Sequence, residues 1–173
     1  MTPVCDAASL YHNRKLFENI PENSFFSVFR EGKQIFDTLK LETLVQILRK
    51  GADVNEVDGE YKMNFLQRLI IEEFSFDAKK VGEEFKKIAE WLYLSGIDIN
   101  YRCADGRTAL HMAAAENDLS MVKWLLEKGA NPAIVDDDGE IPFDYVDNVK
   151  PLYICKDFAL KIQEMRTLLQ IKK

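Results

Sequence analysis

Three related strings recur along the chain, and their spacing constrains the fold more than any other feature of the sequence. They are LRKGADVNEVD at Leu48–Asp58, YLSGIDINYRC at Tyr93–Cys103 and LEKGANPAIVD at Leu126–Asp136. Each string contains a glycine; the second and third glycines are 33 residues apart, and the first and second are 45 apart. A period of this length indicates stacked structural repeats, with extra residues inserted in the longer interval.

The stretch DLSMVKWLLEKG, which leads into the third glycine, predicts an amphipathic helix. Four apolar residues form one stripe at positions i, i+3, i+6 and i+7: Leu119, Val122, Leu125 and Leu126. Polar residues face away from this stripe: Ser120, Lys123 and Glu127. Gly129 is expected to end the helix, because only glycine adopts the left-handed conformation there without a Cβ penalty.

A second, shorter helix is expected ahead of the first, over TALHMAAA. Its alanines allow close packing, and Thr108 is placed to cap it. Two short helices cannot bury their apolar faces alone, so each pair must stack on the next. The sequence therefore predicts an all-α solenoid of helix-turn-helix units joined by short β-hairpin-like tips.

This pattern resembles the ankyrin repeat, whose motif runs from a turn glycine through T-P-L-H and two helices to G-A-D-V-N. The best match runs from Gly106 to Gly129 and includes Thr108, Ala109, Leu110 and His111. The G-A-D-V-N part recurs at residues 51–55, and a degenerate start recurs at Gly139, Ile141, Pro142, Phe143 and Asp144. The resemblance covers about residues 34–147.

The repeat between the first two glycines departs from the family motif. Asn64 and Gln67 stand where the family has Thr and His, and Leu69 and Ile70 are larger than the usual alanines. The extra residues lie near 71–84 and are expected to lengthen or separate the helix pair. Three phenylalanines there need cover from solvent: Phe74, Phe76 and Phe85.

We expect residues 1–173 to form a single ankyrin-repeat domain with helical caps. Residues 1–33 would be the N-terminal cap, with helices at Asp6–Ile20 and at Ser24–Glu31, the second of them capped by Ser24. Three to four repeats would fill 34–147, and 148–173 would hold a C-terminal capping helix. The apolar residues expected to close the stack on that helix are Leu160, Ile162, Met165, Leu168 and Leu169.

Composition restricts the classes of partner and compartment. A formal net charge of −6 and a sequence pI near 5.1 argue against nucleic acid as a partner. The lysines at 79, 80, 86 and 87 have the spacing expected of a solvated helix face, and they could also form a local basic surface. No apolar run is long enough to span a membrane, and the first residues lack the pattern of a secretory signal. The three separate cysteines, Cys5, Cys103 and Cys155, are expected to be free thiols in a reducing compartment.

No motif in the sequence predicts catalysis, a metal or a cofactor. His111 and Cys103 could suggest a nucleophilic pair, but the resemblance implies a structural role for this histidine. The run Asp136–Asp138 with Glu140 lacks the order of a calcium loop, which favours an acidic hairpin tip. The alternative of a different class is an enzyme or enzyme fragment with its site in the aromatic and carboxylate-rich insertion 71–85, around Glu72, Glu73, Phe74, Glu83 and Glu84.

The resemblance implies that hairpin tips and the exposed edge of the inner helices bind a protein partner. The candidate partner-binding residues are Tyr61, Lys62, Arg102, Asp105, Arg107, Glu116, Asp137, Asp138 and Glu140. Tyr61, Arg102 and Arg107 are the expected energetic anchors, because Tyr and Arg are enriched at binding hot spots. The acidic tip predicts a partner with a basic patch.

The function expected from these features is a non-catalytic adaptor, inhibitor or effector. The chain is expected to be monomeric by itself and cytoplasmic; it also resembles effectors that intracellular bacteria deliver into the host-cell cytosol. Asn55 and Asn100 occupy a position similar to the asparaginyl-hydroxylation site of eukaryotic ankyrin repeats, and whether either is hydroxylated stays open.

Overall fold

The chain forms two compact units in the computed structural model, which describes residues 21, 23–29, 41–59, 61–73, 78–146 and 156–170. The units are Met1–Ile97 and Asp98–Lys173. The regular elements of the described residues are helices, apart from one isolated antiparallel bridge between Val57 and Asn64. The predicted all-α repeat architecture is confirmed.

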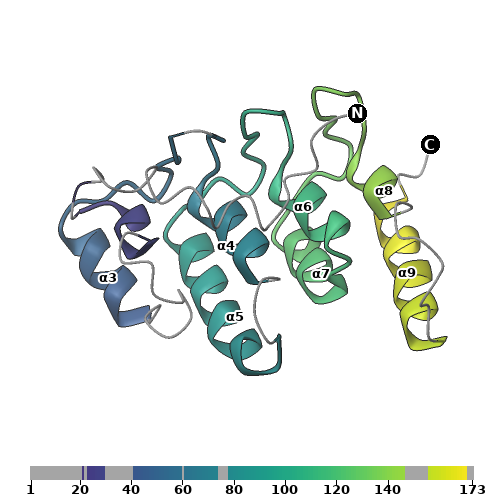
Figure 1. The fold of residues 1–173 in the computed structure, drawn as a ribbon, viewed down its shortest axis with the longest axis horizontal. Coiled ribbons are helices and arrows are strands. Elements are labelled where there is room, and N and C mark those ends of the chain that lie inside the picture. Colours follow the sequence, from purple (N-terminus) through teal and green to yellow (C-terminus); the bar gives the residue numbers. More distant parts are fainter. Residues whose placement is uncertain are drawn as a thin grey trace. The chain divides into compact units, whose positions relative to one another are not determined.

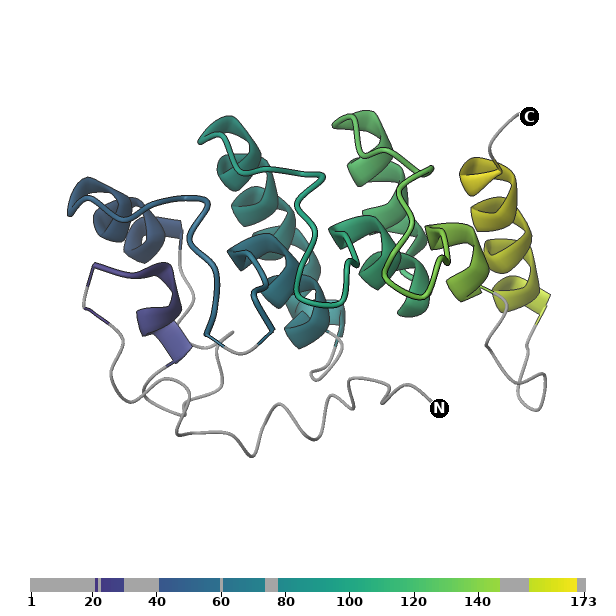
Figure 2. The ribbon, with the colours of Figure 1, turned by 90° about the horizontal axis from the view of Figure 1, so that it is seen from above.

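The first unit pairs a short inner helix with an outer helix twice (Figures 1 and 2). The elements are the 3₁₀ helix η2 (Phe25–Phe29), α3 (Leu41–Arg49), α4 (Phe65–Glu73) and α5 (Ala78–Leu94). Aromatic rings fill the core between them: Phe65 lies 5.5 Å from Phe25 and 5.7 Å from Phe26, measured between ring centroids. The Trp91 ring of α5 meets Phe25 edge-on at 6.1 Å.

The second unit repeats the arrangement with smaller side chains. Its elements are α6 (Ala109–Ala115), α7 (Leu119–Glu127), α8 (Pro142–Tyr145) and α9 (Lys156–Leu169). Inner helix α6 is buried from Ala109 to Ala114, and outer helix α7 buries Met121, Val122 and Leu125 against it. Of the predicted α7 stripe, Val122 and Leu125 form the centre, and Leu119 and Leu126 are half-buried.

The repeated glycines end the outer helices as the sequence predicts. Gly51, Gly96 and Gly129 have φ values of +93°, +91° and +90°. After α7, the Gly129 N–H donates to Leu126 O at 3.1 Å and the Ala130 N–H donates to Leu125 O at 2.9 Å. The same pair of bonds recurs after α3 and α5, so each outer helix closes with a Schellman motif.

The inner helices share one capping scheme built from different residues. At α6, the Thr108 N–H donates to Nδ1 of His111 at 3.1 Å. At α4, the Asn64 N–H donates to Oε1 of Gln67 at 2.9 Å, and the Gln67 N–H donates back to Oδ1 of Asn64 at 3.0 Å. The departures from the family motif in the first unit therefore preserve the reciprocal cap at the helix start.

The inserted residues of the longer repeat lengthen its outer helix. Helix α5 has 17 residues, whereas α7 has 9. Phe85 of this helix is buried, as the sequence requires. Phe74 and Phe76 lie outside the described residues.

Within the segment predicted as helical at Ser24–Glu31, the described residues form the short 3₁₀ helix η2. The predicted helix at Asp6–Ile20 lies outside the described residues. The Ser24 hydroxyl accepts the Phe26 N–H at 3.1 Å, whereas the Phe25 N–H donates to Glu56. With these donors engaged outside an α-helical pattern, the segment takes the tighter form that short helices use.

Helix α9 is present as predicted, but the predicted apolar face is wrong at Leu160 and Leu168. Met165 and Leu169 are fully buried, whereas Leu160 is 69% exposed and Leu168 is 37% exposed. Five residues turn an α-helix by about 140° from its starting direction, so Leu160 points away from the face that carries Met165. The side chain of Ile162 lies outside the described residues.

Truncation of α9 side chains tests which face is buried. Met165→Ala should lower the free energy of unfolding by about 2–5 kcal/mol, because it leaves a cavity. Leu160→Ala, the matched control, should change it by less than about 0.5 kcal/mol. Urea unfolding followed by circular dichroism measures both; a larger loss for Leu160→Ala would reverse the assignment of the buried face.

Candidate functional site

The hairpin between α7 and α8 is organised by the buried carboxylate of Asp136. Its Oδ1 accepts the N–H groups of Asp138 at 3.0 Å and Glu140 at 2.9 Å. Its Oδ2 accepts the Tyr145 hydroxyl at 2.5 Å. Burial alone would raise the pKa of Asp136, but these three donors outweigh it and hold the pKa below its usual value. Hydrogen bonds to this buried carboxylate therefore fix the backbone of the hairpin tip.

Asp58 has the corresponding place in the hairpin of the first unit. Its Oδ1 accepts the N–H groups of Tyr61 at 3.1 Å and Met63 at 3.2 Å. The guanidinium of Arg68, a side chain that is 1% exposed, lies 3.8 Å from Asp58 Oδ2. Burial nevertheless raises the pKa of Asp58, since the carboxyl lies in the interior and the ion pair is long.

In the hairpin between α5 and α6, Cys103 stands where the other two hairpins have aspartate. Its N–H donates to Arg107 O at 3.0 Å, as that of Asp136 does to Glu140 O. Asp105 supplies the acceptor: its Oδ1 receives the Cys103 Sγ–H at 2.9 Å and the Arg107 N–H at 3.3 Å. The side chain of Arg107 also pairs with this carboxylate.

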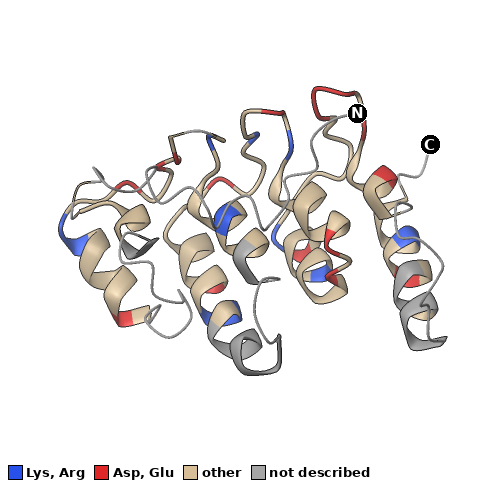
Figure 3. Ribbon diagram, in the orientation of Figure 1, with Lys and Arg blue, Asp and Glu red and all other residues tan. Residues whose placement is uncertain are grey.

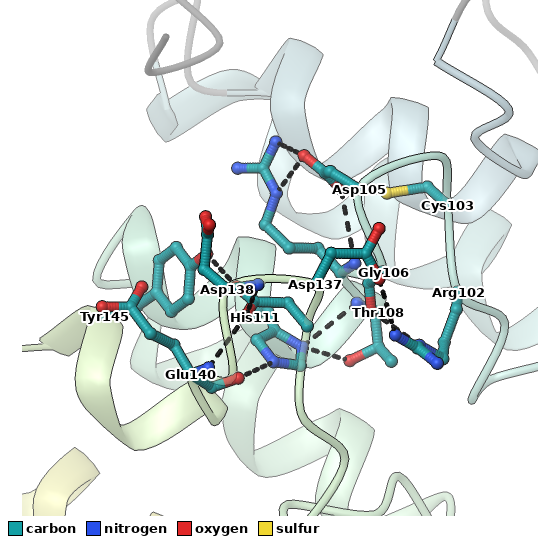
Figure 4. Close-up of polar contacts among 12 residues, drawn as sticks. Arg102, Cys103, Asp105, Gly106, Thr108, His111, Asp137, Asp138, Glu140 and Tyr145 are labelled. Carbon is teal, nitrogen blue, oxygen red and sulfur yellow. Dashed lines mark hydrogen bonds and ion pairs between the residues drawn. The ribbon is translucent and has the colours of Figure 1, made fainter. Parts of the chain in front are cut away.

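Arg102 joins the two hairpins of the second unit (Figure 4). Its Nε donates to Gly106 O at 3.1 Å, and its Nη2 lies 2.9 Å from Asp137 Oδ1. The Asp137 N–H in turn donates to Asp105 O at 3.1 Å. A Cβ on Gly106 would come within 2.5 Å of both Arg102 Nη2 and Asp137 Oδ1, so this contact requires glycine.

His111 connects the start of α6 to the next hairpin (Figure 4). Its Nδ1 lies 2.9 Å from the Thr108 hydroxyl and accepts the Thr108 N–H, and its Nε2 lies 3.2 Å from Glu140 O. Because Nδ1 is an acceptor and Glu140 O needs a donor, the ring is neutral with its proton on Nε2. Burial lowers the pKa of His111, which is consistent with the neutral form.

His111 and Cys103 are each engaged elsewhere and do not form a nucleophile–base pair in the structure. Burial and the neighbouring Asp105 raise the pKa of the Cys103 thiol to about 12. A thiol of that pKa stays protonated at neutral pH and is a poor nucleophile. Within the described residues, no three His, Cys, Asp or Glu side chains gather as metal ligands would.

The structure brings four of the predicted partner-binding residues into one network: Arg102, Asp105, Arg107 and Asp137. The side chain of Arg107 is only 16% exposed, whereas that of Arg102 is 49% exposed. Both arginines already hold carboxylates of the chain itself. Replacing either would therefore disturb the tip as well as any binding by it.

Three of the exposed predicted residues have no side-chain hydrogen bond or ion pair within the described part of the chain: Lys62, Asp138 and Glu140. Asp138 and Glu140 belong to the acidic hairpin between α7 and α8 (Figure 3). Lys62 lies in the hairpin of the first unit, next to the half-buried Tyr61, and has a φ of +50°. These three residues lie in the hairpins whose backbone N–H groups donate to the buried carboxylates of Asp136 and Asp58.

Glu116 lies apart from the tip network. It follows the last residue of α6, at the end of the helix opposite to Thr108 and the hairpin. Of the alternative site in the insertion, residues 74–77 and the side chains of Glu72, Glu73, Glu83 and Glu84 lie outside the described residues.

The sequence did not reveal the buried residues whose side chains bind the hairpin backbones. Asp136 was interpreted as part of an exposed acidic tip, but it is 5% exposed. The signal was present in the repeated strings, because two of the three end in aspartate at the same position: Asp58 and Asp136. The contribution of Tyr145 and the buried position of Arg68 have no counterpart in the family motif.

Comparison with known proteins shows the class. The family model for ankyrin repeats in many copies matches residues 86–126 and 111–146. These ranges contain α6, α7, α8 and most of α5, with the hairpins between them. Residues 86–146 of the chain are therefore ankyrin repeats. Repeats of this family generally mediate protein–protein interaction and are typically non-enzymatic.

Relatives come from a bacterium, a virus and a mammal. A putative ankyrin repeat protein of Borreliella burgdorferi is 41% identical over 74 residues, which are 42% of this chain and 18% of the relative. A putative ankyrin repeat protein of fowlpox virus is 26% identical over 130 residues, 62% of this chain and 30% of the relative. The liver isoform of rat mitochondrial glutaminase is 46% identical over 52 residues, 30% of this chain and 9% of the enzyme. The chain thus spans under a third of each of these proteins.

Removal of the Asp136 carboxylate tests the account of the tip. Asp136→Ala should lower the free energy of unfolding by about 1–3 kcal/mol, because two backbone N–H groups and the Tyr145 hydroxyl lose their acceptor. The matched control Asp138→Ala, from the exposed part of the same tip, should leave stability within about 0.5 kcal/mol. Chemical denaturation at pH 7 measures both.

The pH dependence of the stability difference between the wild type and Asp136→Ala tests whether the charged carboxylate is its cause. The folded-state pKa of Asp136 lies below its unfolded value, so its contribution is complete above the unfolded pKa, about 3.9. It is lost as the pH falls through the folded pKa. The stability gap between the wild type and Asp136→Ala should therefore narrow only below about pH 4. A gap that does not change down to pH 2 would show that the charged carboxylate is not responsible.

Proposed function

We propose that the protein is a non-catalytic binding module that holds a protein partner through its hairpin tips and the exposed edge of its inner helices. The observation that carries this proposal is a contrast within each tip. The backbone is fixed by buried acceptors such as Asp136, whereas the side chains of Asp138 and Glu140 make no hydrogen bond or ion pair with any residue that the structure describes. A backbone that is already fixed loses little further entropy when a partner binds, so only the side chains have to be ordered.

Charge supports a partner with a basic patch. In the second unit Arg102 neutralises Asp137 and Arg107 neutralises Asp105. Among the described residues, no cation pairs with the carboxylates of Asp138 and Glu140, so the described part of this tip has an excess of negative charge. Such a surface accelerates association with a basic partner and makes the rate sensitive to salt.

The finer role we propose is that of an adaptor, inhibitor or effector acting as a monomer in a reducing cytosol. Cys103, a buried free thiol, is consistent with that compartment. If a bacterium exports the protein, the compartment would be the host-cell cytosol. None of the described helices has the combination of length and apolarity needed to cross a bilayer. We also propose that residues 1–173 act as one ankyrin-repeat domain, and that nucleic acid is not a partner.

The test is affinity capture from cell lysate, read by quantitative mass spectrometry, with the wild type and a tip variant. The tip variant carries Lys62→Ala, Asp138→Asn and Glu140→Gln, which remove three exposed charges without removing a bond between described residues. A protein captured by the wild type should be reduced at least about tenfold with the tip variant, equivalent to about 1.4 kcal/mol of binding. Circular dichroism checks that both chains are folded.

A control variant on the outer helices separates the tips from the rest of the surface. It carries Glu42→Gln, Lys86→Ala and Glu127→Gln, which are exposed and match the tip changes in number and charge. The control should capture the partner as the wild type does. Equal capture by all three chains, or a loss with the control alone, would contradict the proposed binding surface.

A further inference from the structure

The hairpin between α7 and α8 carries an exposed apolar side chain beside its acidic residues. Val135 directly precedes the buried Asp136 and is 47% exposed. The other large apolar side chains that are exposed in the described part of the chain lie on the helices α5 and α9, so Val135 is the one that a hairpin presents. Apolar surface in contact with water is unfavourable, and a partner that covers it gains the corresponding free energy.

The hairpin fold does not require an apolar residue at this position. The residue after Val135 donates its N–H to Glu140 O at 2.9 Å, and the residue after Arg102 donates its N–H to Arg107 O at 3.0 Å. Val135 and Arg102 therefore occupy the same position in two successive hairpins. Since one hairpin closes with a guanidinium there and the other with an isopropyl group, neither group is needed to form the turn.

Two carboxylates accompany Val135 on this hairpin. The hydrogen bond from the Asp136 N–H to Glu140 O joins the two sides of the hairpin at the residue next to Val135. The Asp136 carboxylate also holds the N–H groups of Asp138 and Glu140. The side chains of Asp138 and Glu140 (Figure 4) are exposed and make no hydrogen bond or ion pair with any described residue. The hairpin therefore presents one apolar group and two carboxylates on a backbone that is already fixed.

We propose that the surface made by Val135, Asp138 and Glu140 binds a segment of the protein partner in which an apolar side chain lies beside lysine or arginine side chains. The proposal rests on the proposed binding function and names the chemistry that this tip selects. The apolar side chain would cover Val135, and the cations beside it would pair with the two carboxylates.

The combination of groups is more selective than acidic charge alone. A segment that is only basic would leave Val135 in contact with water. A segment that is only apolar would bury two carboxylates without a cation, which is costly. The partner segment therefore needs both kinds of side chain close together.

The test uses a defined peptide, so that it does not depend on knowing the partner. The probe is the acetylated and amidated peptide GKSLSKG, whose leucine and two lysines share one face when the peptide is extended, because alternate side chains point the same way. The full chain, with ¹³C-labelled methyl groups and ¹⁵N-labelled amides, is titrated while NMR follows the Val135 methyls and the amides of Asp138 and Glu140. We expect saturable shifts with a dissociation constant on the order of 1 mM, since a short flexible peptide loses entropy on binding.

Two further peptides separate the apolar contact from the charges. GKSSSKG keeps the lysines but lacks the leucine, and it should bind at least about threefold more weakly, because Val135 then stays in water. GESLSEG keeps the leucine but reverses the charges, and it should give no saturable shift, because like charges repel.

Two variants assign the apolar contact to one residue. Val135→Thr keeps the shape of the side chain but replaces a methyl group by a hydroxyl. It should weaken the binding of GKSLSKG to nearly that of GKSSSKG and leave the binding of GKSSSKG unchanged. Val57→Thr, which changes the corresponding residue of the first hairpin, is the matched control and should keep the preference for leucine. Thermal unfolding followed by circular dichroism checks that both variants are folded.

Four results would overturn the inference: no saturable shift with GKSLSKG, equal binding of GKSLSKG and GKSSSKG, binding of GESLSEG as tight as that of GKSLSKG, or an unchanged preference for leucine in Val135→Thr. These outcomes are separate from the capture experiment. If the tip variant loses the partner but the wild type shows no preference for the leucine peptide, the proposed function stands and this inference fails. If the preference is present but all three chains capture the same proteins equally, the proposed binding surface fails.

Discussion

The structure depends on hydrogen-bond acceptors buried inside its hairpins. A hairpin tip that extends into solvent has backbone N–H groups that no helix or sheet can satisfy, and each one left buried without a partner costs free energy. Asp136 satisfies two of them and binds Tyr145. His111 then links α6 to the following hairpin through Glu140 O. Because these contacts join a hairpin to its neighbours, the shape of one tip depends on residues in the adjacent repeat.

The same physical requirement is met by different side chains along the chain. Thr108 and His111 cap α6, whereas Asn64 and Gln67 cap α4 with the same geometry. Where Cys103 replaces the aspartate of the other hairpins, Asp105 becomes the acceptor. The sequence can diverge at such positions as long as each backbone group keeps a partner, which is why a degenerate repeat still folds. The side chains of Asp138 and Glu140 take no part in these printed bonds, which use only their backbone groups, so those side chains can change without breaking the networks.

Features that depend on local pattern were predictable, and features that depend on neighbouring elements were not. The glycine spacing correctly placed the ends of α3, α5 and α7, because a left-handed C-terminal residue is a local requirement. The buried face of α9 depends on where α7 and α8 lie, so an apolar stripe that included Leu160 was assigned to the wrong side. The ion pair of Arg102 with Asp137 joins residues that are 35 apart in sequence, and composition could not reveal it.

The protonation state of the His111 ring tests this account most directly, because the ring joins two repeats only as one tautomer. A long-range ¹H–¹⁵N NMR spectrum of the histidine rings distinguishes the tautomers and follows their titration. The account predicts a neutral His111 ring with its proton on Nε2 and no titration near 6.5, the usual pKa of histidine, because burial lowers its pKa. A ring that titrates normally, or that has its proton on Nδ1, would contradict the account, since neither state can accept from Thr108 while donating to Glu140 O.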